Sequence, residues 1–274
     1  MNRHRYIAFK DIKICHFGPY VLTDISNLET GGVSVRKINY VDTDGCEHRD
    51  IFYNERMFEI SGFIQADNAE EMVKHKRRLI SRCSLKEKFR IEYFNRKEKY
   101  SAECFFDKLP TFSKRTGWFL PFKLYAVIPG FYWESALMHT VDIFGYQDEI
   151  KDTFTLPCVF TSKFHSKTVS NLGDGEVYPV FVVKCNDSTV GSTIVIKNNT
   201  TGKKVLIDYQ TSDYEVVTVD MYNQYVQSNM NGNITNKVSI DSEFFALEVG
   251  ANDIEAISAG NVVVVQFRDR FLGV

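Results

Sequence analysis

The sequence lacks the features that mark a membrane or secreted protein. No apolar run reaches the roughly 18 residues that a membrane helix needs. Asp11 and Lys13 interrupt the segment after the basic N-terminus, so we expect neither a signal peptide nor membrane insertion. The six cysteines are scattered singly, with no Cys-x-x-Cys pair. A disulfide framework or a zinc site requires clustered cysteines, so we expect reduced thiols that pack inside the protein.

The usual signatures of catalysis and of nucleotide binding are missing as well. The chain has no Gly-Lys-Ser/Thr phosphate loop and no Gly-x-Ser-x-Gly nucleophile turn. Asp42-Thr43-Asp44-Gly45 matches the start of a calcium loop only in part, because its glycine comes two positions too early and position 53 is Tyr. The six histidines are isolated from one another. We therefore expect no catalytic residue, no cofactor and no metal site.

What the chain does have is the composition of a globular protein with two domains. Of its 274 residues, 44% are hydrophobic and 25% are charged, which excludes wholesale disorder. The formal charge of −2 is too close to neutral for a protein whose main task is to hold nucleic acid. Residues 1–135 carry 23 Lys and Arg against 18 Asp and Glu (+5), and residues 136–274 carry 10 against 17 (−7). This asymmetry predicts two domains with different neighbours, which we place at 1–133 and 134–274.

Alternating polarity in the first half predicts short strands around one helix. Asp44-Gly45 separates two alternating runs and is typical of a hairpin turn, because glycine accepts the positive φ that such a turn requires. The expected strands are Tyr6–Phe9, Ile12–His16, Val33–Val41, Cys46–Tyr53, Phe58–Ile64, Phe89–Phe94, Tyr100–Lys108 and Trp118–Val127.

The helix is predicted to follow Asp67, which can cap it. Glu70, three residues on, completes a capping box. The apolar residues that follow fall mostly on one face at helical spacing. They are Ala69, Met72, Leu79, Ile80 and Cys83.

Basic residues crowd the second half of this helix. A solvated helix face is the simpler interpretation, and the alternative is an electrostatic contact with an acidic protein neighbour. On the second interpretation, the candidate protein-interface residues are Lys74, Arg77, Arg78 and Arg82 on the helix, with Asp44 and Gly45 at the expected hairpin tip.

The second half reads as almost purely β. Many short strands at regular intervals, separated by turn clusters, are typical of an antiparallel sandwich or small barrel. The turn clusters are Asn198–Gly202, Asn231-Gly232-Asn233 and Gly250-Ala251-Asn252. The expected strands are Val177–Lys184, Thr193–Lys197, Lys203–Tyr209, Glu215–Asp220, Tyr225–Val226, Val238–Ile240, Phe244–Glu248 and Val262–Phe267.

A series of turn motifs in a fixed order gives the second half a family resemblance. The motifs are Asn171-Leu172-Gly173-Asp174, Pro179 before an apolar strand, Ile196-x-Asn198, Thr200-Thr201-Gly202, Asp220, Asn231-Gly232 and Leu247-x-x-Gly250-x-Asn252. The first half ends in Phe122–Val127 followed by Pro129-Gly130-Phe131-Tyr132. Taken together, these motifs make nearly the whole chain resemble the siphophage distal tail proteins. Those proteins are baseplate-hub components of the phage tail family.

This resemblance implies a mainly β protein with a structural role. It implies an N-terminal β-sandwich or split-barrel domain with one α-helix, which assembles as a hexameric ring, and a C-terminal galectin-like antiparallel β-sandwich. The implied partners are further copies of the chain, the tail tube protein and the tail-associated lysin or tail-tip hub protein. A receptor-binding protein is a further possible partner, although the second half has no long insertion to form an arm. DNA is expected to pass through the lumen without specific binding. The implied location is the virion tail tip, after assembly in the bacterial host cytoplasm.

Two other functions stay open at the level of sequence. A carbohydrate-binding module for host cell-wall recognition would suit a lectin-like second half, and Phe131, Tyr132 and Trp133 could stack on a sugar. Aromatic residues at a domain junction are more often packing residues, which is the interpretation we favour. A cell-wall hydrolase would need two carboxylates in one cleft, and the sequence singles out no such pair.

Overall fold

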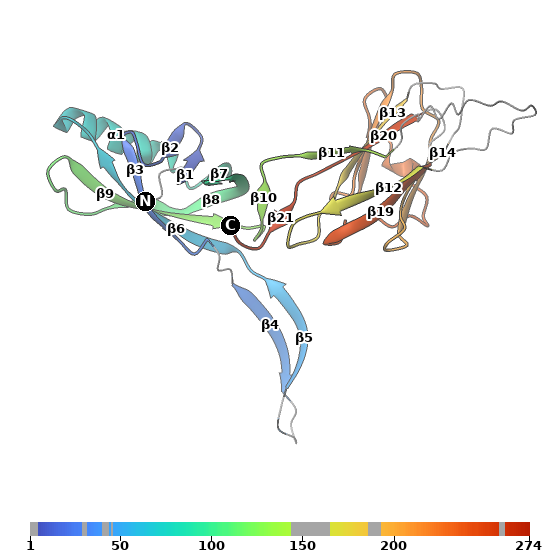
Figure 1. Cartoon of the computed structure of the whole chain (residues 1–274), viewed down its shortest axis with the longest axis horizontal. Coiled ribbons are helices and arrows are strands. Elements are labelled where there is room, and N and C mark those ends of the chain that lie inside the picture. Colours follow the sequence, from blue (N-terminus) through green and yellow to red (C-terminus); the bar gives the residue numbers. More distant parts are fainter. Residues whose placement is uncertain are drawn as a thin grey trace, which may run out of the picture. The chain divides into compact units, whose positions relative to one another are not determined.

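The computed structural model describes residues 5–28, 32–39, 44, 46–143, 165–185, 193–257 and 261–274. They form two compact units (Figure 1). Unit 1 comprises the chain up to Ala136 together with Arg270–Val274, and unit 2 comprises Leu137–Asp269. The chain therefore leaves unit 1, forms unit 2 and returns. The sequence patterns placed all of residues 134–274 in the second domain and gave no sign of this return.

Unit 1 is built on a nine-stranded antiparallel sheet. Its strands are β1 (Arg5–Phe9), β2 (Ile12–Ile14), β3 (Tyr20–Ser26), β6 (Arg56–Gln65), β7 (Phe89–Asn95), β8 (Glu98–Phe112), β9 (Phe119–Ile128), β10 (Trp133–Ser135) and β21 (Arg270–Phe271). The main order is β2-β1-β7-β8-β9-β6-β3, and β10 pairs with both β8 and β21. A parallel bridge between Cys15 and Val21 connects the two outer strands, so the sheet curls back on itself. The mainly β prediction for this half is confirmed, although β3 was not anticipated.

One helix covers the core of unit 1. It is α1 (Ala69–Arg82), whose Met72 and Leu79 side chains are buried. Its N-cap is Asn68 and not Asp67 as expected, since the Asn68 side chain accepts a hydrogen bond from the Glu71 N–H at 2.8 Å. The Asp67 N–H donates to the Glu71 carboxylate at 3.3 Å. The arrangement is similar to a capping box shifted by one residue, except that Glu71 accepts from the residue before the N-cap.

Strands β4 (Val33–Asn39) and β5 (Cys46–Tyr53) form a hairpin that is a sheet of its own. They pair from Val33 opposite Tyr53 to Asn39 opposite Cys46, with a bulge beside Arg36. Within the described residues these two strands pair only with each other, and Figure 1 shows the hairpin standing clear of the nine-stranded sheet. The predicted hairpin is confirmed, but its turn falls almost wholly outside the described residues.

Unit 2 consists of two antiparallel sheets. The six-stranded sheet has the order β11-β20-β13-β16-β17-β18, and the four-stranded sheet has the order β12-β19-β14-β15. The bounds are β11 (His139–Asp142), β12 (His165–Asn171), β13 (Val180–Cys185), β14 (Thr193–Asn198), β15 (Lys204–Asp208), β16 (Val216–Asp220), β17 (Tyr225–Ser228), β18 (Gly232–Asn233), β19 (Gly250–Ile257) and β20 (Asn261–Phe267). Apolar side chains from both sheets, such as Phe181 and Ile196, form one buried core. The expected β-sandwich is confirmed.

Three local predictions in unit 2 are wrong. Val238–Ile240 is not a strand, because the short helix η1 (Thr235–Lys237) ends there and Val238 makes a single bridge to Ile207. Phe244–Glu248 is also irregular, with a single bridge from Leu247 to Val177. Conversely, Gly250–Asn252, which was expected to be a turn, begins β19. A strand forms where a segment finds a continuous partner, as β19 does with β12 and β14, and local patterns do not contain that information.

The turn motifs of unit 2 act as hydrogen-bonding anchors. Asn198 and Asn252 are wholly buried. The Asn198 side-chain oxygen accepts from the N–H groups of Thr200 and Thr201, and the Asn252 amide donates to the carbonyl of Glu248 at 2.8 Å. Buried amides of this kind satisfy backbone groups at sharp turns. The motifs therefore maintain the fold, as their sequence suggested.

Candidate interaction sites

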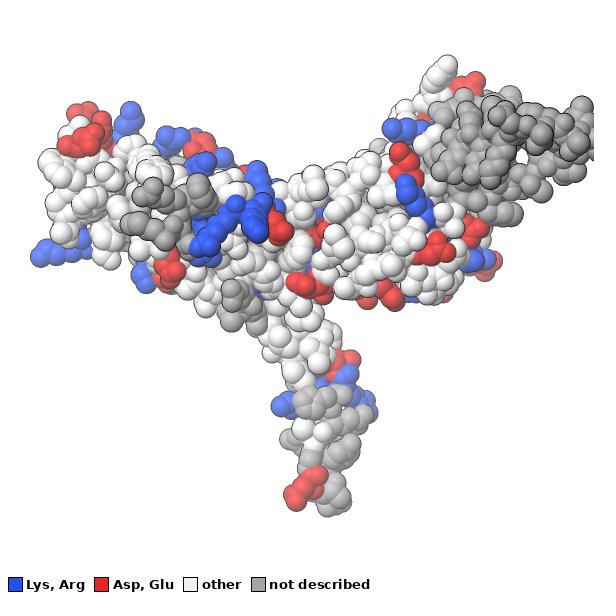
Figure 2. Space-filling view, viewed as in Figure 1, with Lys and Arg blue, Asp and Glu red and all other residues white. Residues whose placement is uncertain are grey.

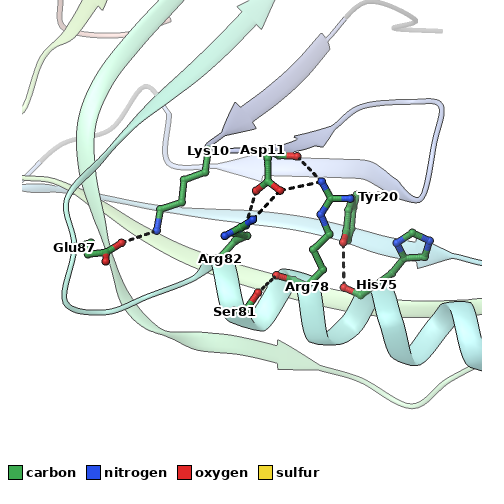
Figure 3. Close-up of polar contacts among 8 residues, drawn as sticks. All are labelled: Lys10, Asp11, Tyr20, His75, Arg78, Ser81, Arg82 and Glu87. Atoms are coloured by element: carbon green, nitrogen blue, oxygen red, sulfur yellow. Dashed lines mark hydrogen bonds and ion pairs between the residues drawn. The ribbon is translucent and has the colours of Figure 1, made fainter.

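Two of the basic residues predicted for a partner also form contacts within unit 1. The Arg78 guanidinium donates to the Asp11 carboxylate at 2.9 Å and to the Asp11 carbonyl at 3.2 Å (Figure 3). Arg82 lies 2.6 Å from the same carboxylate through Nε. Asp11 occupies the turn between β1 and β2, so these contacts attach the helix to that turn. Sequence reasoning missed them because Asp11 is far from the helix along the chain.

The same contacts fix the ionisation of Asp11 and the position of the helix. The hydrogen bond from Arg82 lowers the pKa of the Asp11 carboxyl, desolvation opposes that effect, and Arg78 lowers the pKa further. On the next turn of the helix, the Tyr20 hydroxyl donates to the His75 carbonyl at 3.0 Å (Figure 3). Burial raises the pKa of Tyr20, so the phenol keeps the proton that it donates. These contacts attach this part of the helix to the rest of unit 1, while the Arg78 and Arg82 side chains stay partly exposed.

Lys74 and Arg77 are the basic candidates that stay available for a partner. Both are exposed, and the described residues give neither side chain an acidic partner. They lie three residues apart on α1, beside the exposed Val73. Lys and Arg side chains gather over unit 1 in Figure 2. Of the two candidates at the hairpin tip, Asp44 is exposed and Gly45 lies outside the described residues.

The hairpin β4–β5 presents an apolar face that sequence reasoning did not single out. Residues paired across the hairpin share a face, which places Val33 and Val35 beside Tyr53 and Ile51. Their exposed fractions are 49%, 36%, 49% and 64%, respectively. The opposite face carries Arg36 and Asp50, which lie 3.9 Å apart. The signal was present in the sequence as two alternating apolar runs, but only the structure shows that no described strand covers them.

The aromatic run at the junction packs inside unit 1. Trp133 is 0% exposed and Phe131 is 6% exposed, so neither presents a face to a sugar. Phe131 stacks on Tyr53 with ring centroids 4.6 Å apart. The packing interpretation is therefore confirmed for these two residues.

The described residues contain no group of three or more His, Cys, Asp or Glu side chains that could hold a metal ion. No helix in the same ranges is long and apolar enough to cross a membrane. Cys83 and Cys104 are buried free thiols. Burial raises the pKa of Cys83 to about 12 and also raises that of Cys104, so both stay protonated and serve as packing residues.

Glu215 is the one fully buried carboxylate among the described acidic residues. It accepts hydrogen bonds from the Ser212 N–H at 2.7 Å, the Tyr209 hydroxyl at 2.5 Å, the Asn231 amide at 3.3 Å and the Ser228 hydroxyl. Burial alone would raise the pKa of Glu215, but these donors together hold it below the usual value. A carboxylate surrounded in this way braces the turn between β15 and β16.

Comparisons with known proteins find a family model and several solved structures that this chain resembles. No curated protein sequence matches the chain. Residues 172–271 match the model of a family described as siphovirus-type tail component, C-terminal domain.

Solved structures extend the likeness to the whole chain. One match is the crystal structure of SPP1 Dit (gp 19.1), described as a paradigm of hub adsorption apparatus in Gram-positive infecting phages. The TM-score is 0.76 at 13% sequence identity, and the match covers 98% of this chain and 100% of that one. Two structures of the phage P2 baseplate in its activated conformation, with Ca and with Sr, give TM-scores of 0.55 and 0.54. Each is 11% identical and matches over 99% of this chain and 100% of the other. At such identities the likeness establishes the fold, and the resemblance read from the turn motifs is confirmed.

Proposed function

We propose that this chain is a siphovirus-type tail component and works as a structural adaptor at the distal end of a siphophage tail. Two findings support the proposal: residues 172–271 match the tail-component family model, and the whole chain has the fold of SPP1 Dit. In this role the chain has no catalytic activity. Copies of it assemble in the host cytoplasm into a hexameric ring at the tail tip, between the tail tube protein and the tail-associated lysin hub, and DNA passes through the ring.

The observation that carries self-assembly is the apolar face of the β4–β5 hairpin. An isolated two-stranded hairpin is marginally stable in water, and this one leaves half or more of Ile51 exposed. A contact with a second copy would cover the apolar face and relieve the cost of exposing it to water. In a closed ring every copy gives and receives the same contact, so no hairpin is left uncovered.

Assembly can be tested with two single substitutions on adjacent residues of the hairpin. Ile51→Lys places a charge on the apolar face, and Phe52→Lys places the same charge on the opposite face, which already carries the Arg36–Asp50 pair. We expect the wild-type chain and Phe52→Lys to form rings at high concentration, and Ile51→Lys to stay monomeric while folded. Native mass spectrometry and electron microscopy measure the ring, and circular dichroism verifies the fold.

The same preparations test the partners. We expect the assembled ring, and not the Ile51→Lys monomer, to bind the purified tail tube protein on one side and the tail lysin on the other. A tape-measure gene upstream and a tail lysin gene downstream would give independent support. If the wild-type chain stayed monomeric at every concentration and also failed to bind both tail proteins, the adaptor role would be refuted.

A further inference from the structure

A buried arginine lies where the hairpin joins the nine-stranded sheet. Arg56 is the first residue of β6, directly after the hairpin segment, and only 1% of it is exposed. A guanidinium keeps its charge in proteins, so burying it requires strong hydrogen-bond partners. Burial lowers the pKa of Arg56, in line with this cost. An arginine at such a position therefore has a structural reason to be there.

Its two hydrogen-bond partners come from distant parts of the chain. One amino group donates to the carbonyl of Leu28, which precedes the hairpin, and the other donates to the carbonyl of Leu272 in the segment Arg270–Val274. Leu28 and Arg56 thus close the root of the hairpin from both sides. The buried Nε atom has no partner within the described residues, so these two carbonyls satisfy the guanidinium almost alone.

The guanidinium also holds the aromatic residue on which the hairpin rests. The Arg56 Cζ atom lies 4.6 Å from the centroid of the Phe131 ring, within cation–π range. The other stacking contact of Phe131 is with Tyr53, the last residue of β5, at a centroid distance of 4.6 Å. Phe131 has a φ of 64°, a conformation that costs a non-glycine residue free energy and persists only where neighbours hold it.

From these contacts we propose that Arg56 is the positioning residue of the β4–β5 hairpin, and that the returning segment Arg270–Val274 holds the hairpin in place through it. Without the Leu272 carbonyl, a buried cation is left with one hydrogen-bond acceptor. The side chain then leaves its site, Phe131 loses the charge above its ring, and Tyr53 loses its support. The root of the hairpin opens, although no residue of the hairpin itself has changed. Only the consequence for ring assembly rests on the proposed function.

The test compares hydrogen exchange in the hairpin of four full-length or nearly full-length proteins and one control deletion. They are the wild type, Arg56→Met, Arg56→Lys and a variant that lacks residues 270–274. A variant that lacks only residues 273–274 is the matched control, because it keeps the Leu272 oxygen atoms. We expect amides of Val33–Val35 and Ile51–Tyr53 to exchange about tenfold or more faster in Arg56→Met and in the longer deletion, since losing a hydrogen bond to a charged group shifts a local opening equilibrium by about that factor.

The controls separate positioning from general stability. We expect the shorter deletion to behave like the wild type, and Arg56→Lys to restore part of the protection because it keeps the charge but forms fewer fixed hydrogen bonds. Amides of β6 and β9 away from the root should exchange at wild-type rates in all folded variants. Equal acceleration throughout unit 1, or an unchanged hairpin in Arg56→Met, would overturn the proposal.

The readout does not depend on assembly, because exchange is measured on the monomer at low concentration. A second measurement follows ring formation at high concentration. If the wild type forms no ring but the hairpin still loosens in Arg56→Met, the positioning role stands and the adaptor role fails. If rings form equally well in Arg56→Met and its hairpin stays protected, the positioning role fails and the adaptor role stands.

Discussion

Replacing the buried carboxylate of Glu215 with an amide should destabilise unit 2 without affecting unit 1. Glu215→Gln preserves the shape of the side chain but turns one oxygen into an N–H donor. If the amide oxygen keeps the three side-chain donors Tyr209, Ser228 and Asn231, its NH2 group faces the Ser212 N–H, so two donors meet and neither is satisfied. A buried unsatisfied donor costs about 1–3 kcal/mol, and the remaining hydrogen bonds lose their charge assistance. We expect a loss of about 3 kcal/mol in the free energy of unfolding of unit 2.

The position of the tryptophans gives this experiment an internal control. Trp118 and Trp133 both lie in unit 1, and the sequence has no other tryptophan. Urea unfolding followed by tryptophan fluorescence therefore reports on unit 1, whereas hydrogen exchange of Val216–Ser228 reports on unit 2. At about 4 °C per kcal/mol for a domain of this size, the unit 2 transition should fall by about 12 °C. Glu243→Gln, on an exposed carboxylate of the same unit, should leave both transitions unchanged.

The difference in stability between the wild type and Glu215→Gln should depend on pH in a defined direction. Because the folded-state pKa of Glu215 is lowered, its contribution is fully present above the unfolded pKa near 4.3 and is lost as the pH falls through the folded pKa. The wild type and Glu215→Gln should therefore converge in stability only once the pH falls below the lowered folded-state pKa of Glu215. A difference that was already absent at pH 7, or that persisted unchanged at low pH, would refute the reasoning.

Two further predictions concern unit 1. We expect the double substitution Lys74→Glu and Arg77→Glu to weaken binding of an acidic tail partner. The melting temperature should stay within about 1 °C of the wild type, because both side chains are exposed. Pull-down with the tail tube protein and the lysin measures the binding, and unchanged binding to both would remove α1 from the interface. We expect Gly62→Ala to destabilise unit 1 by about 3 kcal/mol or more, because an added Cβ would lie 2.4 Å from the Val21 carbonyl oxygen. Gly130→Ala, where the added Cβ has open space, is the matched control, and equal thermal stability of the two variants would contradict the argument.

The sequence predicted those parts of the fold that local patterns determine. Alternating polarity found both strands of the β4–β5 hairpin, and the capping pattern placed α1 within a residue, although Asn68 and not Asp67 caps it. Strand β3 was not predicted because Asp24 interrupts the alternation of apolar and polar residues. The structure has a bulge at this point, after Leu22. A bulge shifts the face on which later residues point, and a period-two pattern does not survive it.

The candidate interaction residues were predicted less well than the fold, because their surroundings depend on contacts between residues that are distant in the sequence. The basic cluster of α1 was visible in the sequence, but only folding brings Asp11 to Arg78 and Arg82. The role of Arg56 was not predicted, because a single arginine beside a strand is common in protein sequences. Its importance arises from Leu28 and Leu272, which are 28 and 216 residues away.

The return of the chain to unit 1 sets an order on biosynthesis. A ribosome delivers β4, β5 and Arg56 early, but it must translate all of unit 2 before the Leu272 carbonyl exists. Until then the nascent protein lacks one of the two carbonyl acceptors that hold the Arg56 guanidinium in its site. Products that terminate before residue 272 never gain that acceptor. If Arg56 positions the hairpin as proposed, completion of translation is a precondition for a settled hairpin.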